Sequence, residues 1–302
     1  MVVTLREVLE PAVGRLRAAG SDSARLDAEL LLGHALGLER TGVLAHPMAA
    51  VGEGQRERFA GLLERRVSGE PVAYIRGVKE FYGLAFGVDA RALIPRPETE
   101  TLVELALARI RGVLTAAPRS AATRPFRVLD VGTGSGAVVV ALARTLARAG
   151  YRDTVRFTAS DRSAAALSLA VENAVSHGVA DLIDFRVADL VDPAVEVDGP
   201  IDLIVANLPY VPTGDLAGLP IGTSFEPPEA LDGGSDGLAV VRALLAELAT
   251  VVANDGAALL EIGANQAAGA LAGAAQLLPG WPARIHDDLG GEPRVLDVTR
   301  PA

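Results

Sequence analysis

In the second half of the chain, apolar residues fall into short runs that end in polar or glycine-rich residues. The clearest run is Ile201 to Ala206, which passes directly into Asn207-Leu208-Pro209-Tyr210. A short, nearly continuous apolar run is typical of a strand buried on both faces. We therefore predict a parallel strand with the tetrapeptide at its carboxyl end, where open α/β sheets bind their ligands.

The pattern of strand, loop and helix recurs along the rest of this region. Further strands are predicted at 128–131, 155–159, 183–187 and 257–263, with helices at 137–149 and 164–177. Strands that alternate with amphipathic helices predict a mostly parallel sheet with helices on both faces. The fold class is therefore α/β, with a doubly wound sheet.

The first 70 or so residues have a helical pattern instead. Apolar residues recur at helical spacing after the capping residues Ser21-Asp22-Ser23 and again from Phe59 to Val67. The aromatic, alternating stretches at 72–75 and 81–88 are typical of a hairpin. The predicted domains are a helical domain (1–72), a β-hairpin linker (73–92) and the α/β domain (93–302). The helical domain is either a packed cap or a partner-recognition domain.

Composition excludes several classes of protein. The chain has no cysteine, so it has no disulfide framework or thiolate site, and its four histidines are scattered, which gives no support for a histidine metal site. No uninterrupted apolar run reaches the roughly 20 residues of a membrane span. The net charge of −10 argues against sequence-independent binding to nucleic acid. We expect a cytoplasmic protein without a metal.

Candidate binding residues follow three successive predicted strands. The loop Gly132-Thr133-Gly134-Ser135-Gly136 opens a helix, whose free N–H groups and flexible glycines suit close approach to a ligand. Its spacing differs from the dinucleotide fingerprint. Asp161 ends the next strand, where an acidic residue binds a ribose diol, and Asp189-Leu190 follows the third, where they can contact an adenine. Each alone is a common turn residue, but together they predict a nucleotide-like cofactor site.

Two further loops border the same predicted cleft. The tetrapeptide offers the Asn207 amide oxygen and the Leu208 carbonyl, held extended by Pro209, and these groups can bind a planar amino or amide nitrogen. Taken alone, it is equally consistent with a turn after a strand. In the Pro-stiffened loop 93–100, Arg96 and Glu98 either border the cleft or are solvated charges at a helix start.

Together these residues resemble the Rossmann-like methyltransferases that use S-adenosylmethionine. Asp130 to Gly136 looks like their cofactor loop, Asp161 their ribose acid and Asp189 their adenine contact. The tetrapeptide resembles the Asn/Asp-Pro-Pro-Tyr pattern of enzymes that methylate a nitrogen conjugated to a planar system. The segments that narrow the resemblance to the release-factor glutamine methyltransferase family are Glu80 to Leu84, Leu93 to Glu100, Glu226 to Leu238 and Leu260 to Gly263.

This resemblance implies methyl transfer to the side-chain amide nitrogen of the glutamine in the Gly-Gly-Gln loop of peptide chain release factors. It implies that the cofactor is bound by Asp130, Gly132, Thr133, Gly134, Ser135, Gly136, Asp161, Asp189, Leu190 and Asn207. The acceptor would be bound by Asn207, Leu208, Pro209, Tyr210, Arg96 and Glu98, with the first four of these forming the catalytic loop.

Leu208 departs from the resemblance, because the family usually has proline there. Asn-Leu-Pro-Tyr also occurs in methyltransferases that modify adenine amino groups in ribosomal RNA. The alternatives are therefore the same chemistry on another protein glutamine, an adenine amino group or a small-molecule amide. A non-catalytic translation adaptor is a further alternative.

Overall fold

The computed structural model describes residues 3–116, 124–191 and 199–302, and the chain forms two compact units. The first unit contains residues 1–78 together with 220–225, and the second contains residues 79–219 and 226–302. Each unit is described by itself below. No helix in the described part of the chain is both long and apolar enough to cross a membrane.

The first unit is a small bundle of helices. Its helices are α1 (Leu5–Ala18), α2 (Ala24–Leu36), α3 (Arg40–Ala45), α4 (Glu53–Val67) and α5 (Val72–Arg76). The 3-10 turn η4 (Ile221–Phe225), from much later in the chain, belongs to the same unit. Large apolar side chains from α1, α2 and α4, including Leu16, Leu31 and Phe59, form its core. The buried Asp27 carboxylate accepts hydrogen bonds from Ser21, Ser23 and Arg66, so the predicted capping serines serve this cluster.

The hairpin after the bundle is shorter than predicted. It consists of β1 (Val78–Phe81) and β2 (Leu84–Gly87), whereas the predicted extended stretch at 72–75 lies in helix α5, so that part of the prediction is wrong. Pro71 precedes the helix, and Gly77 ends it in the left-handed region at φ 70°. Burial of Tyr74 and Ile75 outweighs the weak strand preference of their side chains.

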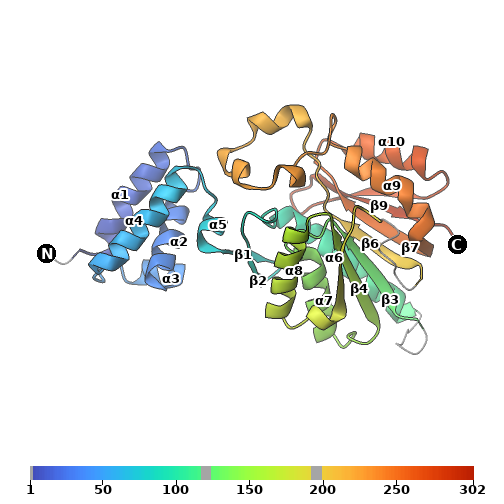
Figure 1. Ribbon diagram of the computed structural model, residues 1–302, viewed down its shortest axis with the longest axis horizontal. Helices are drawn as coiled ribbons and strands as arrows, with labels where there is room; N and C mark the ends of the chain where they lie inside the picture. The colour runs from blue at the N-terminus through green and yellow to red at the C-terminus, as the bar shows by residue number, and fades with distance from the viewer. Residues whose placement is uncertain (1–2, 117–123, 192–198) are drawn as a thin grey trace. The chain divides into compact units, whose positions relative to one another are not determined.

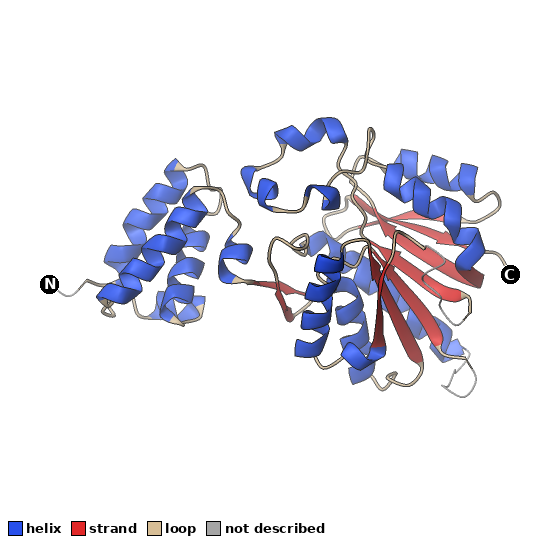
Figure 2. Ribbon diagram, in the orientation of Figure 1, coloured by secondary structure: helices blue, strands red, loops and turns tan. Residues whose placement is uncertain are grey.

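The second unit contains the predicted α/β sheet (Figure 2). Its seven strands lie in the order β5-β4-β3-β6-β7-β9-β8, of which the first five are parallel and the last two antiparallel to their neighbours. The strands are β3 (Phe126–Val131), β4 (Val155–Asp161), β5 (Ile183–Val187), β6 (Ile201–Ala206), β7 (Val252–Glu261), β8 (Ala283–Asp287) and β9 (Pro293–Thr299). The predicted doubly wound, mostly parallel sheet is confirmed.

Helices cover both faces of this sheet (Figure 1). On one face lie α6 (Glu100–Ala116), α7 (Ala137–Arg148) and α8 (Ala164–Ser176), and on the other α9 (Ala239–Val251) and α10 (Ala267–Leu277). Alternate strand residues such as Leu129, Ile204 and Leu260 pack in one core with α9 and α10. The residues between them are also buried, and they face the opposite helices.

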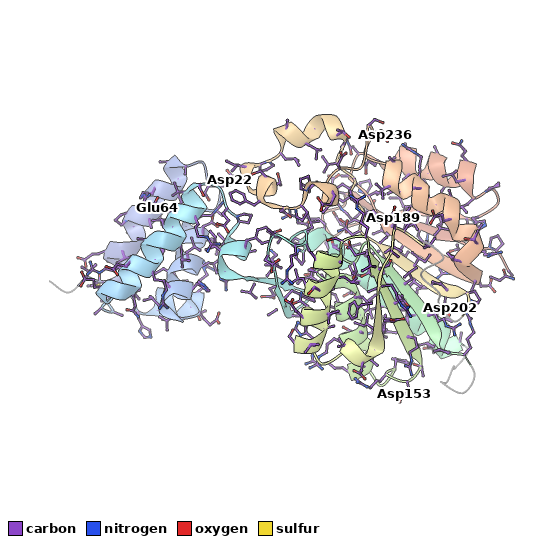
Figure 3. The ribbon with its side chains drawn as sticks, viewed as in Figure 1. Asp22, Glu64, Asp153, Asp189, Asp202 and Asp236 are labelled. Atoms are coloured by element: carbon purple, nitrogen blue, oxygen red, sulfur yellow. The ribbon has the colours of Figure 1, made fainter. Side chains whose placement is uncertain are left out.

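The parallel strands all end at one rim of the sheet. Figure 3 shows Asp189, which follows β5, at that rim, whereas Asp202 at the start of β6 and Asp153 before β4 lie at the opposite end. The 3-10 turns of this unit are η1 (Pro97–Thr99), η2 (Ala180–Leu182), which precedes β5, η3 (Thr213–Gly218) and η5 (Pro228–Ala230). This topology brings the ends of β3, β4, β5, β6 and β7 together, as a ligand site requires.

Candidate active site

A cleft at this rim collects most of the residues that the sequence predicts for the site. The predicted residues that line it are Arg96, Asp130, Gly132, Thr133, Gly134, Ser135, Asp161, Asp189, Leu190, Asn207, Leu208 and Pro209. Gly136, Tyr210 and Glu98 are not part of this lining. Glu98 is exposed on η1, and Tyr210 is half-buried behind the loop that Asn207 begins.

The glycine loop after β3 has the conformation that only glycine adopts easily. Gly132, Gly134 and Gly136 have φ angles of 69°, 56° and 78°. A Cβ on Gly136 would lie 3.0 Å from the Cβ of Ala170, and one on Gly132 would lie 3.0 Å from Cδ2 of Leu208. The glycines therefore allow the loop to turn tightly while it packs against α8 and the loop after β6.

Asp130, at the end of β3, holds the glycine loop through hydrogen bonds. Its carboxylate is buried and accepts a hydrogen bond from the Thr133 hydroxyl at 2.7 Å. Burial raises the pKa of Asp130 to about 7, because desolvation of the charge outweighs the stabilising hydrogen bonds from Thr133 and the Val139 backbone. Asp130 thus fixes the path of the loop across the floor of the cleft.

Asp161 is fixed at the end of β4 by backbone groups. One carboxylate oxygen accepts the Gly134 N–H at 2.9 Å, and the other accepts the Ser163 N–H at 2.8 Å. Burial raises the pKa of this carboxyl. Each carboxylate oxygen can accept more than one hydrogen bond, so capacity remains for the two hydroxyls of a ribose.

Asp189 and Leu190 form the third predicted feature, after β5. The Asp189 side chain is exposed at the rim, and Leu190 adopts φ 50°, a value uncommon for a residue other than glycine. The Leu190 carbonyl accepts the Ser160 hydroxyl at 3.5 Å, which ties this turn to β4. Both residues line the cleft beside Asp161.

The loop after β6 presents Asn207 to the cleft in a defined orientation. Its Nδ2 donates to the hydroxyl of Thr99 at 3.0 Å, which leaves Oδ1 as the acceptor for a ligand. Thr99 is buried at the end of η1, so the Pro-stiffened loop 93–100 supports the amide. Sequence reasoning included Thr99 only as part of the segment Leu93 to Glu100 and gave it no role of its own, because its partner Asn207 is distant in the chain.

Leu208 turns its side chain into the protein core. It is 5% exposed and packs with strand and helix residues that include Val131, Leu238 and Ile262. Its Cδ2 also lies against Gly132 of the glycine loop. The side chain therefore supports the floor of the cleft, and the backbone carbonyl is the polar group that this residue can offer to a ligand.

The glycine-rich segment 231–237 packs against the loop that follows β6. Val211 donates to the Leu231 carbonyl at 3.0 Å and accepts from the Gly233 N–H at 2.8 Å. A Cβ on Gly233 would lie 2.7 Å from the Pro209 carbonyl oxygen, so no larger residue fits. The Gln266 amide donates to the Tyr210 carbonyl at 2.8 Å. These contacts fix the backbone that carries Asn207.

Arg96 and the buried Glu226 form an ion pair at the edge of the cleft. The Arg96 guanidinium donates to Glu226 Oε1 at 2.5 Å, and Glu226 Oε2 accepts the Ile94 N–H at 3.1 Å. Glu226, which sequence reasoning did not single out, thereby ties the segment after η4 to the loop 93–100. Arg96 lines the cleft, and its contact with an acceptor stays a prediction.

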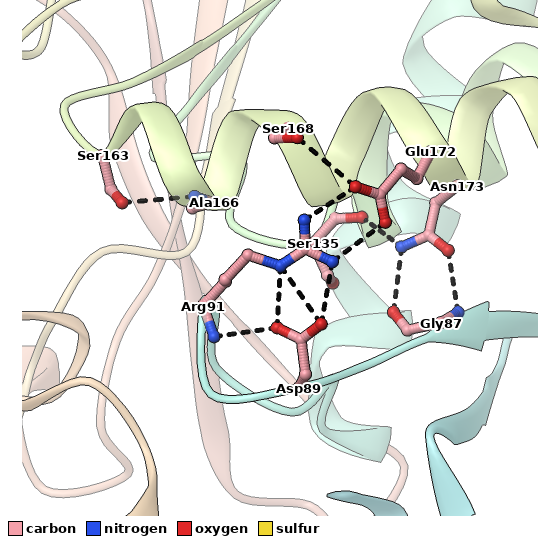
Figure 4. A network of polar contacts seen from close by, with 9 residues as sticks. All are labelled: Gly87, Asp89, Arg91, Ser135, Ser163, Ala166, Ser168, Glu172 and Asn173. Carbon is pink, nitrogen blue, oxygen red and sulfur yellow. Dashed lines mark hydrogen bonds and ion pairs between the residues drawn. The ribbon is translucent and has the colours of Figure 1, made fainter.

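An asparagine connects the hairpin to the glycine loop (Figure 4). The Asn173 side chain is buried on α8, where its Oδ1 accepts the Gly87 N–H at 2.7 Å. Its Nδ2 donates to the Gly87 carbonyl at 3.0 Å and to the Ser135 carbonyl at 2.9 Å. On the surface nearby, Arg91 pairs with Asp89 and Glu172. Sequence reasoning assigned Asn173 no role, because its partners are distant in the chain.

Comparison with known proteins identifies the family of this chain. Residues 7–77 match the sequence profile of the PrmC N-terminal domain, and residues 123–258 match that of a methyltransferase domain. The release factor glutamine methyltransferase of Bradyrhizobium diazoefficiens is 39% identical over 289 residues, which are 95% of this chain and 91% of that protein. The enzyme of the same name from Deinococcus radiodurans is 39% identical and covers 98% of each chain.

The chain belongs to the release factor glutamine methyltransferase family. Among solved structures, the catalytic domain of hMettl16 in complex with MAT2A 3'UTR hairpin 6 is 14% identical, covers 85% of each chain and has a TM-score of 0.52. That similarity concerns the fold alone. The burial of the Leu208 side chain in the core explains how the loop accommodates a leucine at this position.

Proposed function

We propose that this protein transfers the methyl group of S-adenosylmethionine to the side-chain amide nitrogen of the glutamine in the Gly-Gly-Gln loop of peptide chain release factors. The observation that carries the proposal is the contact of Leu208 with Gly132, which joins the cofactor loop to the Asn207 loop within one cleft. The relatives that span nearly the whole chain are named release factor glutamine methyltransferases, which supports the proposal. Such an enzyme acts on translation proteins in the cytoplasm.

The residues of the cleft fit the proposed cofactor. The positive-φ glycines leave room for its amino acid part beside the helix N-terminus, Asp161 retains acceptor capacity for the ribose, and Asp189 with Leu190 borders the adenine position. When bound, S-adenosylmethionine supplies a methyl group on a positively charged sulfur, which makes that methyl electrophilic. The protein then has to align the nucleophile.

Alignment is the contribution of the Asn207 loop. An amide nitrogen is a weak nucleophile, since its lone pair is delocalised into the carbonyl. Asn207 Oδ1 and the Leu208 carbonyl accept its two N–H bonds, and Pro209 bounds the plane of the acceptor. Such alignment lowers barriers by roughly 7–11 kcal/mol in the most favourable intramolecular reactions. Arg96 in the cleft and Glu98 on the exposed surface of η1 would both contact the release factor.

Incubation with methyl-labelled cofactor and purified release factors tests this proposal. We expect label in the peptide that contains Gly-Gly-Gln, located on the glutamine by mass spectrometry, and none in a release factor with that glutamine replaced by asparagine. Ribosomal RNA and small amides serve as competing acceptors in the same assay. Label in ribosomal RNA or a small amide, and not in the release factor, would show that the enzyme acts on that acceptor. Absence of label in every acceptor would favour a non-catalytic adaptor.

A further inference from the structure

The last residue of β7, Glu261, is buried next to the Asn207 loop. Leu260 pairs with Ala206 of the parallel strand β6, so Glu261 and Asn207 leave the sheet side by side. The Glu261 side chain is fully buried. Within the described residues, neither of its carboxylate oxygens has a hydrogen-bond partner. A buried polar group without partners is uncommon and calls for an explanation.

The charged groups around Glu261 do not neutralise it. Arg294 attracts it, but the Arg294 guanidinium donates to Asp288 at 3.2 Å and to the Ile262 carbonyl at 3.4 Å. Glu98 adds a charge of the same sign. Burial therefore raises the pKa of Glu261 to about 7. The carboxyl can gain or lose its proton near neutral pH.

Two hydroxyls face this carboxyl, one from Thr99 and one from Tyr210. Both lie near enough to lower the pKa of Glu261, although neither completes a hydrogen bond to it. Burial, with the nearby charge of Glu261, raises the pKa of Tyr210 to about 12, so the phenol keeps its hydrogen. The Thr99 oxygen already accepts Asn207 Nδ2. Its own hydrogen is then directed away from Asn207, toward the side where Glu261 lies.

We propose that Glu261 is a positioning residue for methyl transfer: it accepts the hydroxyl hydrogen of Thr99 and thereby keeps Asn207 Oδ1 turned toward the acceptor nitrogen. This inference rests on the proposed function and deepens it. The short chain of groups is Glu261, Thr99, Asn207 and the acceptor amide. Its contacts tighten when the acceptor is bound, as catalytic hydrogen bonds commonly do.

The direction of hydrogen bonding along this chain depends on the ionisation of Glu261. The ionised carboxylate accepts from both hydroxyls, which leaves the Thr99 oxygen to accept from Asn207 Nδ2. The neutral acid can donate to Thr99 instead, and Thr99 then donates to Asn207 Oδ1, which turns the Asn207 NH₂ group toward the acceptor. Two N–H groups that face one another cannot form the productive hydrogen bond, so turnover requires the ionised form.

The rate of methylation as a function of pH tests the inference. At saturating cofactor we expect kcat of the wild type to rise about tenfold between pH 6 and pH 8, as one group with a pKa near 7 ionises. E261Q should have a lower kcat that changes less than twofold over this range. Titration of Asp130, which lies in the cofactor loop, should affect the KM for the cofactor rather than kcat.

Thr99 provides matched control variants. T99V removes the hydroxyl at nearly constant volume and should lower kcat and remove its pH dependence, whereas T99S keeps the hydroxyl and should restore a higher kcat than T99V together with the rise in kcat between pH 6 and pH 8. The double variant E261Q/T99V should be no slower than the slower single variant, because both changes break one chain. If E261Q does not fold, the comparison of T99V with T99S decides the question alone.

The possible outcomes separate the two proposals. A wild-type rise in kcat that persists in folded E261Q or in T99V would overturn the role of Glu261 while leaving the proposed function intact. A wild-type kcat that is flat between pH 6 and pH 8 would overturn it as well. Wild-type protein that methylates no release factor would overturn the proposed function, and the inference with it.

Discussion

The Asn207 side chain is expected to affect the rate of methyl transfer without affecting the affinity for the cofactor. Its Nδ2 is bound to Thr99, and Oδ1 remains for the acceptor, while the floor of the cofactor region is built from the loop after β3. The residue therefore contributes to alignment of the acceptor more than to the affinity for the cofactor. This difference can be measured with one substitution.

N207A should lower kcat by at least about 10²-fold, the size of effect seen when a positioned hydrogen-bonding group is removed from an active site. The cofactor Kd, measured by calorimetry, should stay within a few-fold of the wild-type value. N207D, which keeps an oxygen but loses the bond to Thr99, should also be slow. Loss of cofactor binding in folded N207A would contradict this assignment.

For the loop 207–210, the sequence predicts the location of the site but not the direction of its side chains. The order Asn207, Leu208, Pro209 and Tyr210 places a polar amide at a strand end, and three of these four residues line the cleft. The sequence does not tell which way each side chain points, and Leu208 faces the core while Tyr210 lies behind the loop. Direction depends on packing between residues that are distant in the chain.

At the scale of elements, Asn173 joins three of them: helix α8, strand β2 and the loop after β3. Its amide replaces the backbone hydrogen bonds that another strand would give to Gly87, and it also holds the Ser135 carbonyl. We infer that the conformation of the cofactor loop depends on this one side chain. The hairpin then acts as a support for the cofactor site.

N173D tests this dependence, because aspartate has the same shape but cannot donate to the carbonyls of Gly87 and Ser135. We expect the cofactor Kd to rise about tenfold, which corresponds to roughly 1.4 kcal/mol. D181N is the control, since Asp181 pairs with Arg152 on the surface of the same unit, neither residue lines the cleft, and such pairs contribute little. Equal effects of the two substitutions would contradict the role of Asn173.

The five parallel strands were predicted from the sequence pattern, and the two antiparallel strands were not. The strands β3, β4 and β6 are mostly buried and rich in apolar residues, so the pattern alone places them within about two residues. The edge strand β8 contains Arg284 and His286 and is half-exposed, and its partner β9 begins with a proline. The sequence of β8 has no apolar run from which a strand is recognised. β9 does contain one, because Val295 to Val298 repeats the sequence of Val128 to Val131 in β3, and sequence reasoning missed this signal.

At the scale of the whole molecule, two buried acids oppose folding at neutral pH. Burial raises the pKa of Asp130 from 3.8 and that of Glu261 from 4.5, each to about 7. Between these values the folded state binds more protons than the unfolded state. The free energy of unfolding therefore falls as pH rises from about 4 to 7, and this loss is complete above the folded pKa.

Urea unfolding of the second unit, followed by the fluorescence of Trp281, the only tryptophan, should show this decrease. E261Q should become more stable relative to the wild type as pH rises from 5 to 8, by up to about 3 kcal/mol, at roughly 1.4 kcal/mol for each unit of pKa difference. D215N, which changes an exposed carboxylate of the same unit, should keep the wild-type slope. An unchanged slope in E261Q would show that Glu261 titrates normally.

The packing of Leu208 on Gly132 has a thermodynamic consequence for the pair of substrates. Whatever orders one loop also orders the other, so the cofactor and the acceptor should strengthen each other's binding by the same factor, as linkage requires. The affinity for a release factor, measured with and without S-adenosylhomocysteine, gives this coupling energy. L208A should reduce it, whereas equal affinities in the wild type would mean that the two loops respond independently. A coupled pair of loops would favour release factor binding after the methyl donor is in place.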